Sequence, residues 1–154
     1  MGKETIKTIK GNLVDIINRE TYGASITLKD GKIFHIQKTG SIENQYILPG
    51  FIDAHVHIES SMCTPANFGA AACKHGTIGI VADPHEIANV LGVEGIDFMV
   101  NNAEGLPFYY LIGVPSCVPA TPFESSGAMI DAATTKTLLQ RDDLHFLAEM
   151  MNYP

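Results

Sequence analysis

Basic side chains are scarce in this sequence of 154 residues: 10 Lys and Arg stand against 17 Asp and Glu, and the formal net charge is −7. A chain this acidic lacks the positive surface that binds nucleic acid or an anionic membrane. It also contains no apolar run of membrane-spanning length and no signal-peptide pattern after Met1. We therefore expect no nucleic-acid partner and no membrane partner.

Cysteine is also rare. Cys63, Cys73 and Cys117 make an odd count without C-x-x-C spacing, which argues against a disulfide framework and favours a reducing cytoplasm. The Ser116-Cys117 pair lies in no G-x-S-x-G elbow, so a nucleophilic serine or cysteine hydrolase is disfavoured. Apolar residues make up 45% of the chain and charged residues 18%, as in globular proteins.

Two regions with different patterns predict two domains. Residues 1–46 are rich in strand-like segments, and Lys29-Asp30-Gly31-Lys32 is a hairpin turn signal, so we expect a small β-rich domain. Within residues 47–154, strands alternate with helices. The expected strands cover residues 46–57, 77–82, 108–113 and 144–151, and the expected helices begin near residues 65, 85, 93 and 131, the first with Thr64 as its N-cap.

Repeated β-α units with short apolar strands predict an α/β fold with a parallel sheet covered by helices. Chemistry in such folds gathers at the carboxyl ends of the strands. Polar residues lie at the end of each predicted strand here, namely His55, His57 and Glu59; Asp83, His85 and Glu86; Ser116; and Glu149. The agreement over four strands predicts a site at that edge of the sheet.

His55 and His57 alternate with aliphatic residues, so both point to the same face of a strand, about 7 Å apart along it. Neutral imidazole is a common ligand of first-row metals, which makes the pair a candidate metal site. A pair of hydrogen-bonded structural histidines is the alternative. Asp53, two residues earlier, either orients a ligand histidine or accepts backbone N–H groups.

Glu149 lies among apolar residues in the fourth predicted strand. A carboxylate in such a strand is costly unless it is paired or bound to a cation, so Glu149 is a candidate ligand. The alternative is a glutamate exposed by an early turn.

Asp83-Pro84-His85-Glu86 fits a helix N-terminus in which Asp83 is the cap and Glu86 completes a capping box. That hypothesis leaves His85 unexplained, so His85 is a candidate for substrate contact. Glu59 either contacts substrate or caps the next helix, and Ser116 is a third candidate at the strand ends.

Four long motifs carry a resemblance. ILPGFIDAHVH at residues 47–57 resembles the first barrel strand of the amidohydrolase superfamily. Its continuation IESSM, together with VADPHEIANVLG at 81–92, VPSCVPATPFE at 114–124 and LAEMMN at 147–152, is similar to the prokaryotic adenine deaminases within that superfamily. The resemblance covers about residues 47–154.

The resemblance implies a metal-dependent hydrolase on a (β/α)₈ barrel, preceded by a small β-rich domain. The reaction would be the hydrolytic deamination of adenine to hypoxanthine and ammonia, with a hydroxide bridging two manganese or iron ions as nucleophile. His55 and His57 would bind one metal, and Glu149 would bridge both and take part in catalysis.

The chain supplies four of the eight strands that such a barrel needs, and the later histidines and aspartate of the family have no counterpart in it. We therefore expect the amino-terminal part of a longer enzyme, or a chain completed by a carboxy-terminal half or by further copies of itself. Two alternatives remain: an inactive truncated fragment or interaction module, and a related amidohydrolase acting on another cyclic amide. The adenine-deaminase-like motifs at residues 81–92 and 114–124, after the second and third strands, count against another cyclic amide as substrate.

Overall fold

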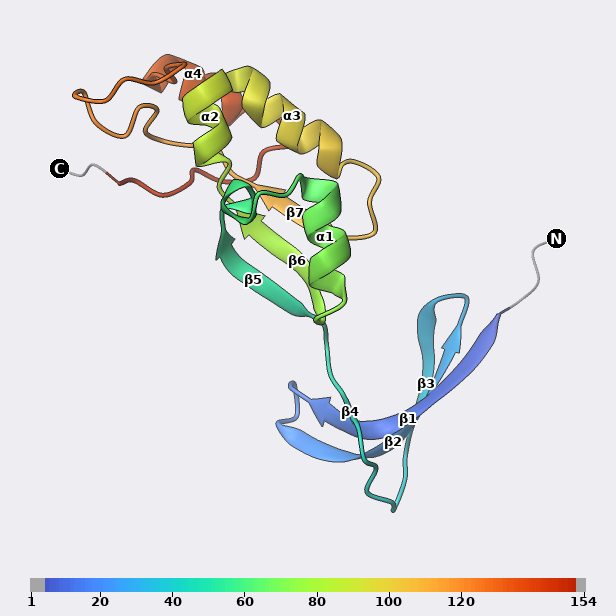
Figure 1. Cartoon of the computed structure of the whole chain (residues 1–154). Coiled ribbons are helices and arrows are strands. Elements are labelled where there is room, and N and C mark those ends of the chain that lie inside the picture. The colour runs from blue at the N-terminus through green and yellow to red at the C-terminus, as the bar shows by residue number, and fades with distance from the viewer. Residues whose placement is uncertain (1–4, 152–154) are drawn as a thin grey trace. The chain divides into compact units, whose positions relative to one another are not determined.

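The computed structural model describes residues 5–151 and contains two compact units that divide between Pro49 and Gly50 (Figure 1). Asn152, the last residue of the fourth motif, lies outside the described residues. Among residues 5–151, none of the helices combines the length and the apolar character needed to cross a membrane. Each unit is described by itself below.

The first unit is a four-stranded sheet in the order β3-β2-β1-β4. Its strands are β1 (Ile6–Asp15), β2 (Glu20–Lys29), β3 (Lys32–Lys38) and β4 (Tyr46–Ile47). The predicted hairpin turn is confirmed, because Asp30 and Gly31 both have positive φ, 50° and 77°, between antiparallel β2 and β3. The buried Asn12 side chain bonds both backbone groups of Glu43, which ties the approach to β4 onto β1.

The strand predicted over residues 46–57 is two strands. β4 pairs in parallel with β1 of the first unit, whereas β5 (Phe51–Val56) starts the sheet of the second unit. Pro49 has no N–H to continue a ladder, and a Cβ on Gly50 would overlap the side chain of Ile78, so the pair breaks the strand. The ladder resumes where the Phe51 N–H donates to the Gly76 carbonyl at 2.9 Å.

The second unit is built on a parallel sheet in the order β5-β6-β7, with β6 at Thr77–Ala82 and β7 at Tyr109–Ile112. The predicted mixed α/β pattern is thereby confirmed. Its helices are α1 (Pro65–Cys73), α2 (His85–Leu91), α3 (Val93–Ala103) and α4 (Ala132–Leu138), and a short 3₁₀ helix, η1 (Ile58–Ser61), follows β5. The hydrophobic core joins Ile80 and Ile112 of the sheet to Ile96 of α3.

Parallel strands bring their carboxyl ends to the same edge of this sheet (Figure 1). η1 follows β5 there, and α2 follows β6 after only two residues. Gly92, at φ 62°, ends α2 and begins α3, as predicted. The residues at this edge therefore come from segments that are distant in sequence.

The predicted fourth strand is not a regular strand. Residues 144–148 run beside the chain that follows β7, but they form only an isolated bridge between Leu147 and Val114. The Ala148 N–H donates to the Val114 carbonyl at 2.9 Å, and the Val114 N–H donates to the Phe146 carbonyl at 2.8 Å. No strand among the described residues pairs with the other side of this segment, so the ladder is too short to make a strand.

The first turn of α1 is capped from outside. Thr64 occupies the N-cap position, as predicted, but its side chain makes no capping hydrogen bond. The Asn102 side-chain carbonyl of α3 accepts the Ala66 N–H instead, at 3.0 Å. This bond holds α1 against α3, and no local sequence signal predicts it.

Asn102→Ala is expected to lower the free energy of unfolding by about 1 kcal/mol, because it leaves the Ala66 N–H without its acceptor. Asn101→Ala is the matched control, since Asn101 is the exposed neighbour on the same helix. Urea denaturation of both variants measures the effect. Equal midpoints for the two variants would show that the cap contributes nothing.

Candidate metal centre

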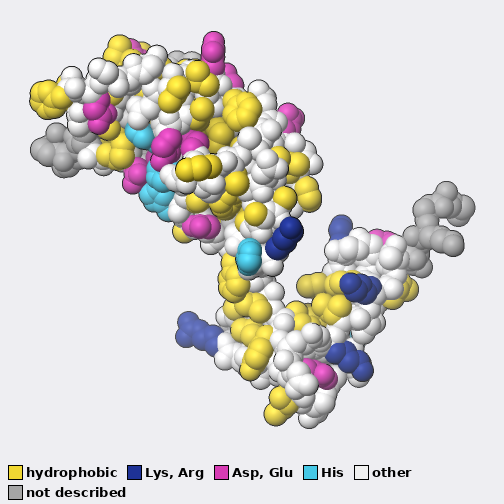
Figure 2. Space-filling view, in the orientation of Figure 1, with side chains coloured by type: hydrophobic (Ala, Val, Ile, Leu, Met, Phe, Trp, Pro, Cys, Tyr) yellow, Lys and Arg dark blue, Asp and Glu magenta, His cyan; other side chains and the backbone are white. Residues whose placement is uncertain are grey.

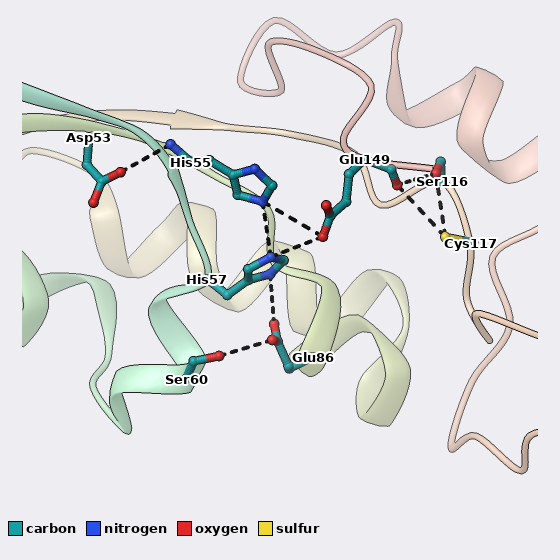
Figure 3. A network of polar contacts seen from close by, with 8 residues as sticks. All are labelled: Asp53, His55, His57, Ser60, Glu86, Ser116, Cys117 and Glu149. Atoms are coloured by element: carbon teal, nitrogen blue, oxygen red, sulfur yellow. Dashed lines mark hydrogen bonds and ion pairs between the residues drawn. The ribbon is translucent and has the colours of Figure 1, made fainter. Parts of the chain in front are cut away.

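Three potential ligand atoms converge at the carboxyl edge of the sheet (Figure 3). Nε2 of His55 lies 3.2 Å from Nε2 of His57. Oε1 of Glu149 lies 3.3 Å from Nε2 of His57 and 3.8 Å from Nε2 of His55. Within the described part of the chain, these three residues form a group whose ligand atoms all lie within 4.8 Å of one another.

The local backbone explains the convergence. β5 ends at Val56, but His57 keeps extended dihedral angles of −104° and 105°, so the alternation continues for one more residue. The imidazoles of His55 and His57 therefore project to the same side, tilted toward each other with ring centroids 5.2 Å apart. The backbone bonds of residues 146–148 to Val114 bring Glu149 to the same edge.

The spacing of these atoms fits a metal ion. Nitrogen and oxygen ligands lie about 2.0–2.2 Å from a first-row metal, so two ligands of the same ion lie roughly 3–3.5 Å apart. The distances of 3.2 Å and 3.3 Å from Nε2 of His57 fall in this range, and the 3.8 Å between His55 and Glu149 is slightly longer. Two imidazole nitrogens and a carboxylate oxygen are also the donor types that such metals take. The residues present thus fit a divalent cation.

The charges around the histidines favour a cation as well. Burial opposes protonation of His57, but the carboxylates of Glu86, Asp83 and Glu149 outweigh it and raise the pKa of the imidazole above its ordinary value. A field that favours a proton on His57 also favours a metal ion on the same ring. Figure 2 shows histidine and acidic side chains gathered together on the surface of the second unit.

The predicted capping box at the start of α2 is wrong. Pro84 occupies the N-cap position, and neither Asp83 nor Glu86 caps the helix. Oε1 of Glu59 accepts the Ile87 N–H at 3.2 Å and thereby supplies the cap from η1. Of the two functions considered for Glu59, the structure shows the capping one.

Glu86 lies in the first turn of α2, but its side chain makes no capping hydrogen bond and contacts His57 instead. Its Oε2 atom lies 3.1 Å from Nδ1 of His57, and its Oε1 atom accepts the Ser60 hydroxyl at 3.1 Å. The Glu86 carboxylate therefore connects η1 to the histidine pair.

The Asp83 carboxylate is buried and makes no hydrogen bond within the described residues. Its side chain is 3% exposed, and neither carboxylate oxygen has a hydrogen-bond partner within residues 5–151. Burial raises the pKa of this carboxyl. Asp83 lines a cavity of about 160 Å³ together with His55, Glu149 and the apolar side chains of Val81 and Leu147.

The other predicted residues do not line this cavity. His85 is 6% exposed and its Nε2 lies 3.2 Å from the Asn89 amide, while its Nδ1 has no partner within residues 5–151. Ser116 donates its hydroxyl to the Glu149 carbonyl at 2.7 Å. Asp53 accepts the backbone N–H of His55 at 3.1 Å, which is one of its two predicted functions.

Sequence patterns missed the roles of Glu86, Asp83 and Asn89. The spacing of Asp83 and Glu86 matched a capping box, which hid their positions beside His57 and the cavity. Asn89 follows His85 by four residues on a helix, and that i, i+4 spacing is the signal that predicts their contact.

Comparison with known proteins gives two findings. Residues 46–153 match the sequence profile of the Amidohydrolase family. Adenine deaminase from Parabacteroides distasonis is 64% identical over 154 residues, which are 100% of this chain and 28% of that protein.

Two further relatives agree. Adenine deaminase from Salinibacter ruber is 50% identical over 147 residues, 96% of this chain and 27% of that protein. Adenine deaminase from Methanosarcina mazei is 52% identical over 149 residues, 97% of this chain and 27% of that protein. The chain thus spans about 28% of the length of the curated relatives it matches.

Proposed function

The chain belongs to the amidohydrolase family, and on that premise we propose that it carries the first part of the active site of an adenine deaminase. The reaction is the hydrolytic conversion of adenine to hypoxanthine and ammonia. The observation that carries the proposal is the convergence of His55, His57 and Glu149. All 154 residues of this chain align with part of an adenine deaminase at 64% identity.

The amidohydrolase family is metal-dependent, and we assign the ligand set to His55, His57 and Glu149. Manganese or iron is the proposed metal, with Glu149 shared between two ions, because a carboxylate offers two oxygens. Divalent ions supply Lewis acidity, which activates water for hydrolysis at neutral pH.

The residues of this chain have separate tasks in the proposal. His55 and His57 present their Nε2 atoms to the metal, and Glu149 adds the negative charge that holds the cations. Asp83 accepts a hydrogen bond from an N–H group of adenine, since both of its oxygens are buried beside the cavity without partners among the described residues. Val81 and Leu147 provide apolar wall for the faces of the purine ring.

The three remaining candidates surround these groups. Nδ1 of His85 and Oε2 of Glu59 are buried, and neither atom has a hydrogen-bond partner within residues 5–151. The Ser116 hydroxyl holds the backbone of Glu149 and can accept a further bond. We propose that all three contact or orient the substrate.

We propose further that the second unit forms the first strands of a (β/α)₈ barrel, because its strands are parallel and alternate with helices. This chain matches 28% of the Parabacteroides distasonis protein. We propose that the strands which complete the barrel and the site correspond to the rest of that protein. A cytoplasmic location agrees with the three unpaired cysteines, Cys63, Cys73 and Cys117.

A chimera tests the function. This chain replaces the matching first 28% of the Parabacteroides distasonis enzyme, and ammonia release is measured with adenine and with a panel of cyclic amides after loading with Mn²⁺. We expect the chimera to deaminate adenine within about tenfold of the parent, and His57→Ala in the chimera to abolish turnover. The 154-residue chain is assayed beside it.

A folded, metal-loaded chimera that leaves adenine untouched while the parent enzyme turns it over would refute the proposal. Turnover of another cyclic amide in place of adenine would refute the substrate and keep the metal centre.

A further inference from the structure

Three contacts join residues 57–60, which follow β5, to the first turn of α2. Glu86 reaches His57 through Oε2 and Ser60 through Oε1, each at 3.1 Å. Glu59 accepts the Ile87 N–H at 3.2 Å. Figure 3 shows Glu86 between the His57 ring and the Ser60 hydroxyl.

The contacts of His57 divide between its two ring nitrogens. Nδ1 faces the Glu86 carboxylate, and Nε2 faces His55 and Glu149. A neutral imidazole carries one proton, and the partner of one nitrogen decides which nitrogen keeps it. Both nitrogens face a carboxylate, Glu86 at 3.1 Å from Nδ1 and Glu149 at 3.3 Å from Nε2. The Glu86 contact is the shorter one and its two atoms are buried, whereas Oε1 of Glu149 also faces His55. A carboxylate accepts and never donates, so the closer, buried Glu86 favours the proton on Nδ1, which leaves the lone pair of Nε2 for a metal.

We propose that Glu86 is the positioning residue of the metal centre: it holds His57 in the Nδ1–H form, and the hydroxyl of Ser60 holds Glu86 in place. This inference rests on the proposed function for the identity of the bound group. The tautomer of His57 itself does not depend on that function.

Residues close to His57 in sequence hold the helix turn that carries Glu86. Glu59 and Ser60 lie two and three residues after His57 in η1, and both bond to the first turn of α2. That turn in turn supplies Glu86 to His57. Nδ1 of His57 and Oε2 of Glu86 are both buried, and neither has a hydrogen-bond partner among residues 5–151. They lie 3.1 Å apart, so a proton on Nδ1 lets each atom offset the cost of burying the other.

Nitrogen-15 NMR of the labelled, metal-free chain tests the tautomer. At about pH 9, above the ordinary range of histidine, we expect Nδ1 of His57 to resonate as a protonated nitrogen and Nε2 as an unprotonated one. Glu86→Ala is expected to shift His57 toward the Nε2–H form. A wild-type His57 with its proton on Nε2 would overturn the proposal.

Mn²⁺ affinity provides the second readout. We expect Glu86→Ala to raise the Kd by about 10–100-fold. Ser60→Ala is expected to raise it by less, and Glu86→Gln to restore part of the loss because it keeps an acceptor oxygen. Glu94→Ala is the matched control, since Glu94 is the exposed glutamate in the first turn of the neighbouring helix α3.

The two readouts separate the hypotheses. If Glu86→Ala leaves both the tautomer and the Kd equal to those of Glu94→Ala, the positioning role is wrong. If the wild-type chain binds no Mn²⁺, the ligand assignment of the proposed function fails, and the NMR result alone decides the role of Glu86.

Discussion

Glu149→Gln is expected to remove stoichiometric Mn²⁺ binding, with a rise in Kd of more than about 100-fold, the upper end for residues that only support a ligand. Glu149 is the one anionic member of the group of three, and its Oε1 atom faces both imidazoles. The amide of Gln keeps the shape but loses the charge that balances the cation. Equilibrium dialysis followed by metal analysis measures the loss.

Glu104→Gln is the control for Glu149→Gln, because Glu104 is exposed and lies next to Gly105 at the end of α3. His55→Ala and His57→Ala are expected to have effects of similar size to that of Glu149→Gln, and His75→Ala, at an exposed histidine after α1, is expected to have none. Unchanged Mn²⁺ binding by Glu149→Gln would mean that the metal site lies elsewhere.

Asp83→Asn is expected to stabilise the metal-free chain by roughly 1–3 kcal/mol. The Asp83 carboxylate is 3% exposed and has no hydrogen-bond partner within the described residues, so the folded chain bears the cost of burying it. The Asn side chain has the same shape without the charge. Urea denaturation in the presence of a chelator measures the difference in free energy of unfolding.

The same substitution is expected to weaken Mn²⁺ binding, because the negative charge of Asp83 lies beside the cavity that His55 and Glu149 share. A gain in stability with a loss of ligand affinity is the signature of a residue kept for function. Asp142→Asn, at an exposed position, is the control and should change neither quantity. Destabilisation by Asp83→Asn would show that the carboxylate has a stabilising partner.

Local signals predicted most elements of the second unit. β6 spans Thr77–Ala82, the predicted residues, and Gly92 separates α2 from α3 as expected. Glycine and proline act on their immediate neighbours, so their effects are readable from sequence. The convergence of His55 and His57 was equally predictable, because a period of two is a property of the strand itself.

Long-range partners account for what local signals missed. The caps of α1 and α2 come from Asn102 and Glu59, 36 and 28 residues away from the N–H groups they accept. The regular strand predicted over residues 144–151 depends on a neighbour on each side, and the described chain supplies one. Such contacts form only once the chain has folded, so a short stretch of sequence does not predict them.

Anomalous diffraction from crystals of the chain grown with Mn²⁺ shows whether His55, His57 and Glu149 hold a divalent metal ion. We predict an anomalous peak about 2.0–2.3 Å from Nε2 of both histidines and from a carboxylate oxygen of Glu149. Crystals that contain Mn²⁺ only at other positions, with these three side chains unligated, would contradict the assignment.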